Sequence, residues 1–113
     1  GYRGGMNALS GSELQTNTIL CSNDRLAIGF LAAAYEKGVR VGIGDNFDMR
    51  VASHDDHPFS RFTGPSLTTV AHDYVAVSNK SVEVLFKLVE AGGDLGARQE
   101  ELFPARLILR ASA

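Results

Sequence analysis

The chain has 113 residues, of which 44% are hydrophobic and 21% charged, and its formal net charge is −2. This length suffices for one domain with a modest core, and the apolar fraction excludes a disordered chain. No apolar run approaches the ~20 residues that span a bilayer, and the few, scattered Lys and Arg residues form no basic patch for nucleic acid. The single cysteine, Cys21, cannot form an internal disulfide, which favours a reducing compartment.

Two helices and a strand are predicted in the first third of the chain. Apolar residues recur at helical spacing over residues 2–9, which predicts a short helix. The polar stretch 10–17 follows as a loop, and the apolar run Thr18–Cys21 predicts a buried strand. A second helix begins after the capping residues Ser22–Asp24, and its apolar residues keep helical spacing up to a C-cap at Gly38.

Two further strands are predicted in the middle of the chain. The stretch 39–48 is too rich in glycine for a regular element and is predicted to be a loop. Met49–Ser53 is predicted to be a strand, and residues 54–65 form a polar and aromatic connection. Ser66–Val70 has the β-propensity of the next strand.

A long helix and a final strand complete the predicted elements. Asp73 is a candidate N-cap for an amphipathic helix that stops at Gly92, and residues 102–110 alternate as a closing strand. Short apolar strands that alternate with amphipathic helices predict an α/β fold with a mainly parallel sheet. In open sheets of this kind, ligands bind at the carboxyl ends of the strands.

Polar side chains follow three of the predicted strands at this edge. The segments are Ser22–Asp24, His54–His57 and Ala71–Tyr74. Asn23 and Asp55 could exchange hydrogen bonds with neighbouring hydroxyls of a small polyhydroxylated ligand. An aromatic ring such as Tyr74 or Phe59 could cover an apolar sugar face. The alternative roles are a helix N-cap for Asn23 and a core aromatic residue for Tyr74.

The motifs of enzymes are weak in this sequence. His54–His57 has the residue types of zinc or iron ligands, but adjacent residues of an extended chain point in opposite directions. We expect one of its aspartates to cap the turn and its histidines to be solvated. No serine lies in a Gly-x-Ser-x-Gly elbow, and Cys21 in a buried strand is expected to be inert. We therefore expect no catalytic residue, no metal and no cofactor; a metal-dependent α/β enzyme using His54–His57 is the alternative.

Several segments, taken in order, carry a family resemblance. They are Cys21–Gly29 with Asn-Asp-x-x-Ala-x-Gly, Gly38–Val41 with Gly-Val-Arg-Val, Ser53–Asp56 with its Asp-Asp pair, Pro65–Val70 with Leu-Thr-Thr-Val, and Leu107–Ser112 with Arg-x-Ser. Together they resemble the effector-binding domain of the LacI/GalR family of bacterial transcription regulators, over nearly the whole chain.

The resemblance implies both a fold and a function. The fold is a three-layer sandwich with a mainly parallel sheet, part of a two-lobed, type I periplasmic-binding-protein-like domain. Residues 1–113 are then the carboxy-terminal portion of an effector-binding and dimerisation domain. A small effector, often a sugar, would bind between the lobes and modulate operator DNA binding by an amino-terminal headpiece outside this chain. We expect a cytoplasmic homodimer that does not enter the membrane; a periplasmic sugar-binding transport receptor is the alternative.

The resemblance also implies roles for particular residues. Those expected to contact the effector are Asn23, Asp55, His72 and Tyr74. Those expected in the dimer interface are Ile28, Leu31, Ala32, Phe59 and Phe62. Asp24 is expected to support the turn instead of touching the effector. Ser53 and His54 replace a glycine and an aromatic residue of the family pattern, and the 42–48 loop lacks its Pro-Glu-Asp, so we expect local differences there.

Overall fold

The computed structural model describes residues 1–11, 14–93, 96 and 100–113, which form two compact units. The first unit comprises residues 1–71 and 106–113, and the second comprises residues 72–105. The elements, in chain order, are α1 (Tyr2–Ser10), β1 (Thr18–Leu20), α2 (Asp24–Glu36), β2 (Arg50–His54), the 3₁₀ helix η1 (Pro58–Phe62), β3 (Thr68–His72), α3 (Tyr74–Glu90) and β4 (Ala105–Ile108). None of the helices in these described ranges has the length and apolar composition needed to cross a bilayer.

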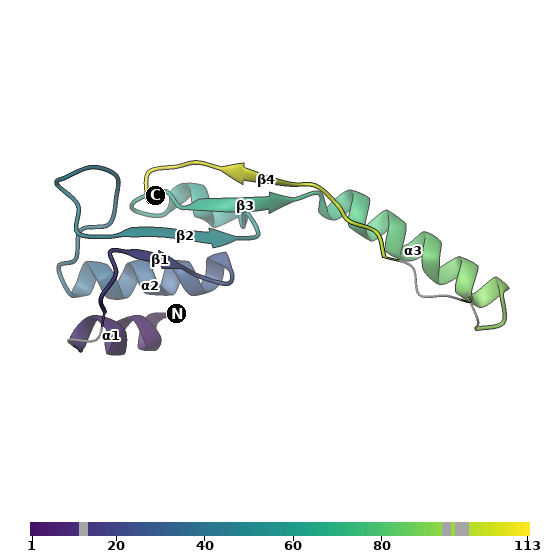
Figure 1. The fold of residues 1–113 in the computed structure, drawn as a ribbon, viewed down its shortest axis with the longest axis horizontal. Coiled ribbons are helices and arrows are strands. Elements are labelled where there is room, and N and C mark those ends of the chain that lie inside the picture. Colours follow the sequence, from purple (N-terminus) through teal and green to yellow (C-terminus); the bar gives the residue numbers. More distant parts are fainter. Residues whose placement is uncertain (12–13, 94–95, 97–99) are drawn as a thin grey trace. The chain divides into compact units, whose positions relative to one another are not determined.

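The strands form one sheet in the order β1-β2-β3-β4 (Figure 1). β1 pairs with β2 in parallel, with Ile19 opposite Val51, and β2 pairs with β3 in parallel, with Ser53 opposite Thr69. The arrow of β4 runs against that of β3 (Figure 1). The predicted α/β fold with a mainly parallel sheet is therefore confirmed. Parallel pairing places the carboxyl ends of β1 and β2 at the same edge.

α2 provides the main helical packing against this sheet. The Asn23 side chain caps its first turn by accepting a hydrogen bond from the Leu26 backbone N–H (2.9 Å). After its last turn the chain reverses at Gly38, whose φ of +70° suits glycine. The buried face of α2 packs against Val51 of β2 and against Leu67, which directly precedes β3. The core cluster consists of Ala27, Phe30, Leu31, Ala34, Val41, Met49, Val51 and Leu67.

α1 packs directly on α2, below the sheet in Figure 1. The two backbones approach so closely that a Cβ on Gly29 would lie 2.6 Å from the Tyr2 nitrogen. A hydrogen bond from the Tyr2 hydroxyl to Glu36 (2.5 Å) joins the start of α1 to the end of α2. Of the three layers expected, the sheet and this helical side are observed in the first unit.

Several details differ from the sequence predictions. β2 lies one residue further along than predicted, and β4 covers Ala105–Ile108 instead of 102–110. β1 is an edge strand and is not buried, because Leu20 is 78% exposed. The connection after β2 contains η1, which begins with Pro58 in its first turn. β3 lies two residues further along than predicted, since Ser66 and Leu67 precede it. Finally, α3 forms as predicted after Asp73, which accepts a hydrogen bond from Ala76 N (2.9 Å), but none of its residues is buried.

Candidate functional site

Asp24 is the buried centre of the polar network beneath the carboxyl ends of β1 and β2. Its carboxylate accepts hydrogen bonds from the hydroxyls of Ser53 on β2, Ser60 on η1 and Thr69 on β3 (2.6 Å for Thr69), and from the backbone N–H of His57 (2.7 Å). Asp24 is fully buried. One side chain at the start of α2 thus fixes the strand β2, the strand β3 and the connection between them.

The hydrogen bonds around Asp24 also set its ionisation. Burial raises the pKa of this carboxyl. The hydrogen bonds from Ser53, Ser60, Thr69 and His57 together lower it by more than burial raises it, so the pKa lies below its usual value. The carboxylate is therefore charged at neutral pH with its oxygen atoms occupied by protein donors. This is the supporting role expected for Asp24, and the donors exclude a direct contact with a ligand at those lone pairs.

Asn23 lies between the end of β1 and the start of α2. Its side-chain oxygen already accepts from Leu26 N, so the capping role expected as an alternative is confirmed. The side-chain amide nitrogen is a second polar group of the same residue. Cys21, which follows β1, is half-buried, and burial raises the pKa of its thiol. A raised pKa keeps the thiol protonated, which makes it a poor nucleophile.

Four polar residues, His54–His57, lie at the end of β2 and directly after it, and they take part in three separate interactions. His54 Nδ1 lies 3.3 Å from Asp55 Oδ1, and these side chains are 45% and 41% exposed. Asp56 pairs with Arg110 (2.6 Å), and His57 Nδ1 accepts from Phe59 N (3.3 Å). No group of three or more His, Cys, Asp or Glu side chains is placed to hold a metal ion in the described part of the chain. The residue that caps η1 is His57, whose ring centroid lies 5.3 Å from that of Phe59.

The backbone at Asp55 and Asp56 is unusual. Their φ angles are +115° and +48°, values that residues other than glycine rarely adopt. The Asp55 N–H donates to Val70 O on β3 (2.8 Å), and the Asp56 N–H donates to Thr69 Oγ1 (3.3 Å). These bonds turn the chain back along β3 and leave the Asp55 side chain half-exposed at the carboxyl end of β2.

The Arg-x-Ser segment near the end of the chain, Arg110–Ser112, forms hydrogen bonds with β2, with the loop after it and with the start of β3. Arg110 donates to Asp56 (2.6 Å) and to Leu67 O (2.8 Å). Ser112 is fully buried; its hydroxyl donates to Val51 O (2.6 Å) and accepts from Thr68 N (2.8 Å). The resemblance singled out this motif, and the structure shows that it connects β2 with the start of β3.

The other two expected effector residues lie in the second unit. His72 ends β3 and Tyr74 begins α3. Their rings contact each other edge to face, with centroids 5.8 Å apart. Tyr74 is 52% exposed, so the alternative reading of Tyr74 as a core aromatic was wrong. Asn23 and Asp55, by comparison, follow neighbouring parallel strands of the first unit.

The residues expected in the dimer interface differ in exposure. Phe59 and Phe62 on η1 are 65% and 78% exposed, Ala32 is exposed and Ile28 is half-buried. Leu31 has only 6% of its surface exposed, because its side chain packs in the core beneath α2. Leu31 is thus a core residue of the first unit, and its place in a dimer interface stays an expectation.

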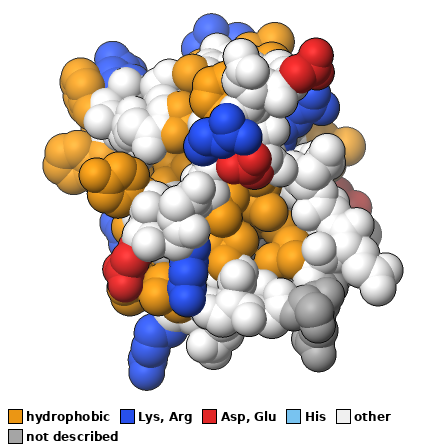
Figure 2. Space-filling model, turned by 90° about the vertical axis from the view of Figure 1, so that its left-hand side faces the viewer, with side chains coloured by type: hydrophobic (Ala, Val, Ile, Leu, Met, Phe, Trp, Pro, Cys, Tyr) orange, Lys and Arg blue, Asp and Glu red, His pale blue; other side chains and the backbone are white. Residues whose placement is uncertain are grey.

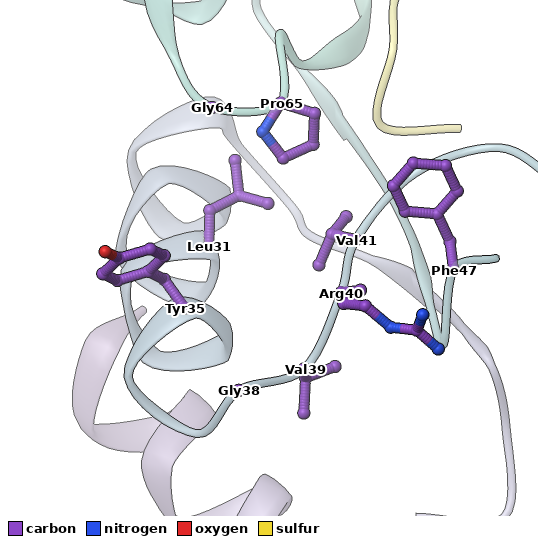
Figure 3. Close-up of a pocket in the computed structure, with 9 residues that line it drawn as sticks. All are labelled: Leu31, Tyr35, Gly38, Val39, Arg40, Val41, Phe47, Gly64 and Pro65. Carbon is purple, nitrogen blue, oxygen red and sulfur yellow. The ribbon is translucent and has the colours of Figure 1, made fainter.

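A largely apolar cavity of about 380 Å³ lies beside the last turns of α2, between this helix and the segment that follows it (Figure 3). Leu31 and Val41 point toward one another across it, and Pro65 closes one side. Figure 2 shows apolar side chains gathered around a hollow on this face. The cavity is lined by Leu31, Tyr35, Gly38, Val39, Arg40, Val41, Phe47, Gly64 and Pro65, so it includes neither Asp55 nor any residue of the polar network around Asp24.

Sequence reasoning missed the hydroxyl donors to Asp24 and the Asp56–Arg110 pair. A signal existed for Ser53: Val51 and Ser53 share one face of β2, so a serine interrupts an otherwise apolar inward face. A buried polar residue at such a position needs a hydrogen-bond partner. The pairing of Asp56 with Arg110, 54 residues apart, has no comparable local signal.

Comparisons with known proteins place the chain in a family. A family model described as a periplasmic binding protein-like domain matches residues 4–113. The PurR transcriptional repressor of Haemophilus influenzae is 33% identical over 74% of the chain, and GalS of Salmonella typhimurium is 30% identical over 99%. These alignments cover 24% and 31% of the two regulators, so the chain spans about a quarter to a third of their length.

The solved structures agree with the sequence comparisons. The lac repressor dimer bound to operator and the anti-inducer ONPF has a TM-score of 0.78 and 29% identity, covering 98% of this chain and 36% of that one. A LacI family regulator from Lactobacillus casei has a TM-score of 0.71 at 23% identity, which covers 96% of this chain and 38% of that one and supports the fold alone. The chain therefore belongs to the LacI/GalR family and forms part of its periplasmic-binding-protein-like domain.

Proposed function

We propose that this chain is the effector-sensing portion of a LacI-type transcriptional regulator, with Asp55 as its principal effector-binding carboxylate. The observation that carries the proposal is the position of Asp55: it follows β2 at the carboxyl edge of a parallel sheet and is 41% exposed. Ligands of open α/β sheets bind at this edge. A backbone strained at a polar residue is a further indication of a functional position.

The proposed effector is a small polyhydroxylated molecule, in the first instance a sugar. A carboxylate such as Asp55 accepts hydrogen bonds from neighbouring hydroxyls, and the amide of Asn23 can donate and accept. Tyr74 supplies an exposed ring of the kind that covers an apolar sugar face. The Lactobacillus casei regulator of the same fold is described with bound sucrose and with bound glucose, so these two sugars are the first probes.

The mechanism we propose is closure of two lobes around the effector. A ligand shifts such an equilibrium only by its differential affinity for the two states. Coupling between effector and operator DNA of about 1–3 kcal/mol is typical of such systems. DNA binding itself would belong to a headpiece outside these 113 residues. The relatives compared above are named as repressors and regulators, which favours this reading over a transport receptor or an enzyme.

The exposed apolar residues of α3 fit the same proposal. None of its residues is buried, and Val75, Phe86 and Val89 are more than half exposed. Such a surface is unfavourable in water unless something covers it. In a two-lobed protein about three times the length of this chain, the other lobe would supply the covering surface.

The proposed function is tested with Asp55→Ala in the intact protein. We expect sucrose or glucose binding, measured by isothermal titration calorimetry, to be lost while the melting temperature stays near that of the wild type, because Asp55 contributes a half-exposed carboxylate and no core packing. Asp45→Ala removes an exposed carboxylate from the 42–48 loop and serves as the matched control. Unchanged sugar affinity in Asp55→Ala would refute the assignment.

A further inference from the structure

The turn that presents Asp55 is held from three sides. The Asp55 N–H donates a hydrogen bond to Val70 O (2.8 Å), and the His57 N–H donates one to the Asp24 carboxylate (2.7 Å). Between them, the Asp56 carboxylate accepts from Arg110 (2.6 Å). Two consecutive positive φ angles at residues with side chains persist only where the surroundings fix them.

The Asp56–Arg110 pair is suited to fixing this turn. Its side chains are only 22% and 14% exposed, unlike the half-exposed His54–Asp55 pair next to it. Arg110 is itself anchored: its second guanidinium nitrogen donates to Leu67 O (2.8 Å), and its backbone N–H donates to Thr68 Oγ1 (2.9 Å). The guanidinium therefore bridges the loop after β2 and the start of β3 with a rigid planar fork.

The two adjacent aspartates thus have separate tasks. The Asp56 carboxylate pairs with Arg110, which is nearly buried. Asp55, whose φ angle is positive, has its side chain half-exposed at the carboxyl ends of the strands. A site of this kind needs supporting contacts, because a ligand-binding group must be held close to its productive geometry. We propose that Arg110, acting through Asp56, is a positioning residue that holds the Asp55 carboxylate in its effector-binding orientation. The inference rests on the proposed function of Asp55.

The proposal predicts a local effect of Arg110→Met that differs from a general loss of stability. Hydrogen exchange of the Asp55 amide should become faster relative to that of the Ala27 amide in α2, because the turn is released while the helix is not. The dissociation constants for sucrose and glucose should rise about tenfold, by analogy with the loss observed when a contact that orients a metal ligand is removed. Arg110→Lys keeps the charge but lacks the fork, so its effect should be intermediate.

Ser112→Ala is the matched control. It removes two buried hydrogen bonds from the same segment, to Val51 O and from Thr68 N, without touching Asp56. We expect a lower melting temperature, with Asp55 exchange and sugar affinity within about twofold of wild type, because the Ser112 side chain shares no hydrogen-bond partner with the side chains of Arg110 and Asp56. If Ser112→Ala changes affinity and exchange as much as Arg110→Met does, the role of Arg110 is merely structural and the proposal fails.

Asp56→Asn and the double variant decide whether the arginine acts through Asp56. If it does, Asp56→Asn with Arg110→Met should weaken sugar binding no more than the stronger single variant. Additive losses, or unchanged Asp55 exchange in Arg110→Met, would overturn the proposal. If the wild type binds neither sucrose nor glucose, the proposed sugar function fails for these probes, whereas the exchange comparison still decides whether Arg110 positions Asp55.

Discussion

The Asp24 carboxylate accepts hydrogen bonds from β2, η1 and β3, so three segments far apart in the sequence depend on one ionised side chain. Burial of a charge is costly, and it is tolerated here because hydroxyl and amide donors surround both oxygens. Among the described residues, every buried side-chain nitrogen or oxygen of a residue that is not itself exposed has a hydrogen-bond partner. Removing the charge of Asp24 should therefore destabilise the folded chain, because its donors would lose their acceptor.

We predict that Asp24→Asn lowers the free energy of unfolding by about 2–4 kcal/mol, because two buried donors would face an amide nitrogen instead of an acceptor. The pKa of Asp24 is lower in the folded chain than the usual 3.8. Its contribution is thus fully present above that value and is lost as the pH falls through the lower folded-state pKa. Urea unfolding at several pH values measures both effects.

The control for this measurement is Asp45→Asn, in which an exposed carboxylate of the 42–48 loop is changed. If Asp24→Asn and the wild type lose stability in parallel as the pH falls from 5 to 2, the carboxylate network does not determine the acid sensitivity.

A second residue-scale prediction concerns Asp48. The guanidinium and backbone N–H of Arg40 donate to its carboxylate (2.7 and 2.8 Å), and these hydrogen bonds lower its pKa to about 2. In Arg40→Met the pKa of Asp48 should rise toward 3.8, as followed by NMR titration of the carboxyl carbon. Arg61→Met, on η1, is the control and should leave that titration unchanged; an unchanged Asp48 pKa in Arg40→Met would contradict the pairing.

At the scale of elements, local signals were sufficient wherever caps and periodicity coincide. α1, α2 and α3 form where predicted because each apolar repeat is bounded by a glycine or an aspartate or asparagine cap. The strands were located to within about three residues, the largest difference being at the start of β4, which lies within the usual uncertainty of boundaries. The η1 helix was missed because a single 3₁₀ turn has no periodicity to detect.

The candidate site could be predicted only in part, for a reason of the same kind. Position after a strand identifies Asn23 and Asp55, since the sheet delivers strand ends to one edge. The positive φ angles of Asp55 and Asp56 could not be foreseen, because they depend on contacts with β3 and with Arg110. Long-range contacts of this kind leave no trace in local composition.

Asn23 permits a prediction at the level of α2. Asn23→Ala should reduce the free energy of unfolding by about 1 kcal/mol, because the Leu26 N–H loses its acceptor. Asn23→Ser retains a capping oxygen and should remain within a few tenths of a kcal/mol of wild type. Urea denaturation measures this difference, and sucrose titration of Asn23→Ser then isolates the effector role: undiminished binding would leave Asn23 as a cap alone.

At the scale of the whole molecule, the expected homodimer can be tested through α2 and η1. Ile28 is half-buried, while Phe59 and Phe62 are strongly exposed. We predict that Ile28→Glu weakens the dimer, because an unpaired charge would be buried at the interface. Sedimentation of the intact protein at micromolar concentration measures this, and Arg25→Glu, on an exposed position of the same helix, is the control. Equal dimer fractions in Ile28→Glu and wild type would count against this surface.

The burial of Ser112 has a consequence for synthesis on the ribosome. Its hydroxyl satisfies Val51 O and Thr68 N, which precede it by 61 and 44 residues. At a translation rate of about 5–20 residues per second, the start of β3 waits roughly 2–9 s for this partner. During that time β1, β2 and α2 can already assemble, but the amino ends of β2 and β3 cannot close. A nascent chain stalled just before Ser112 should therefore be a substrate for chaperones and proteases, although almost all of its core residues have been made.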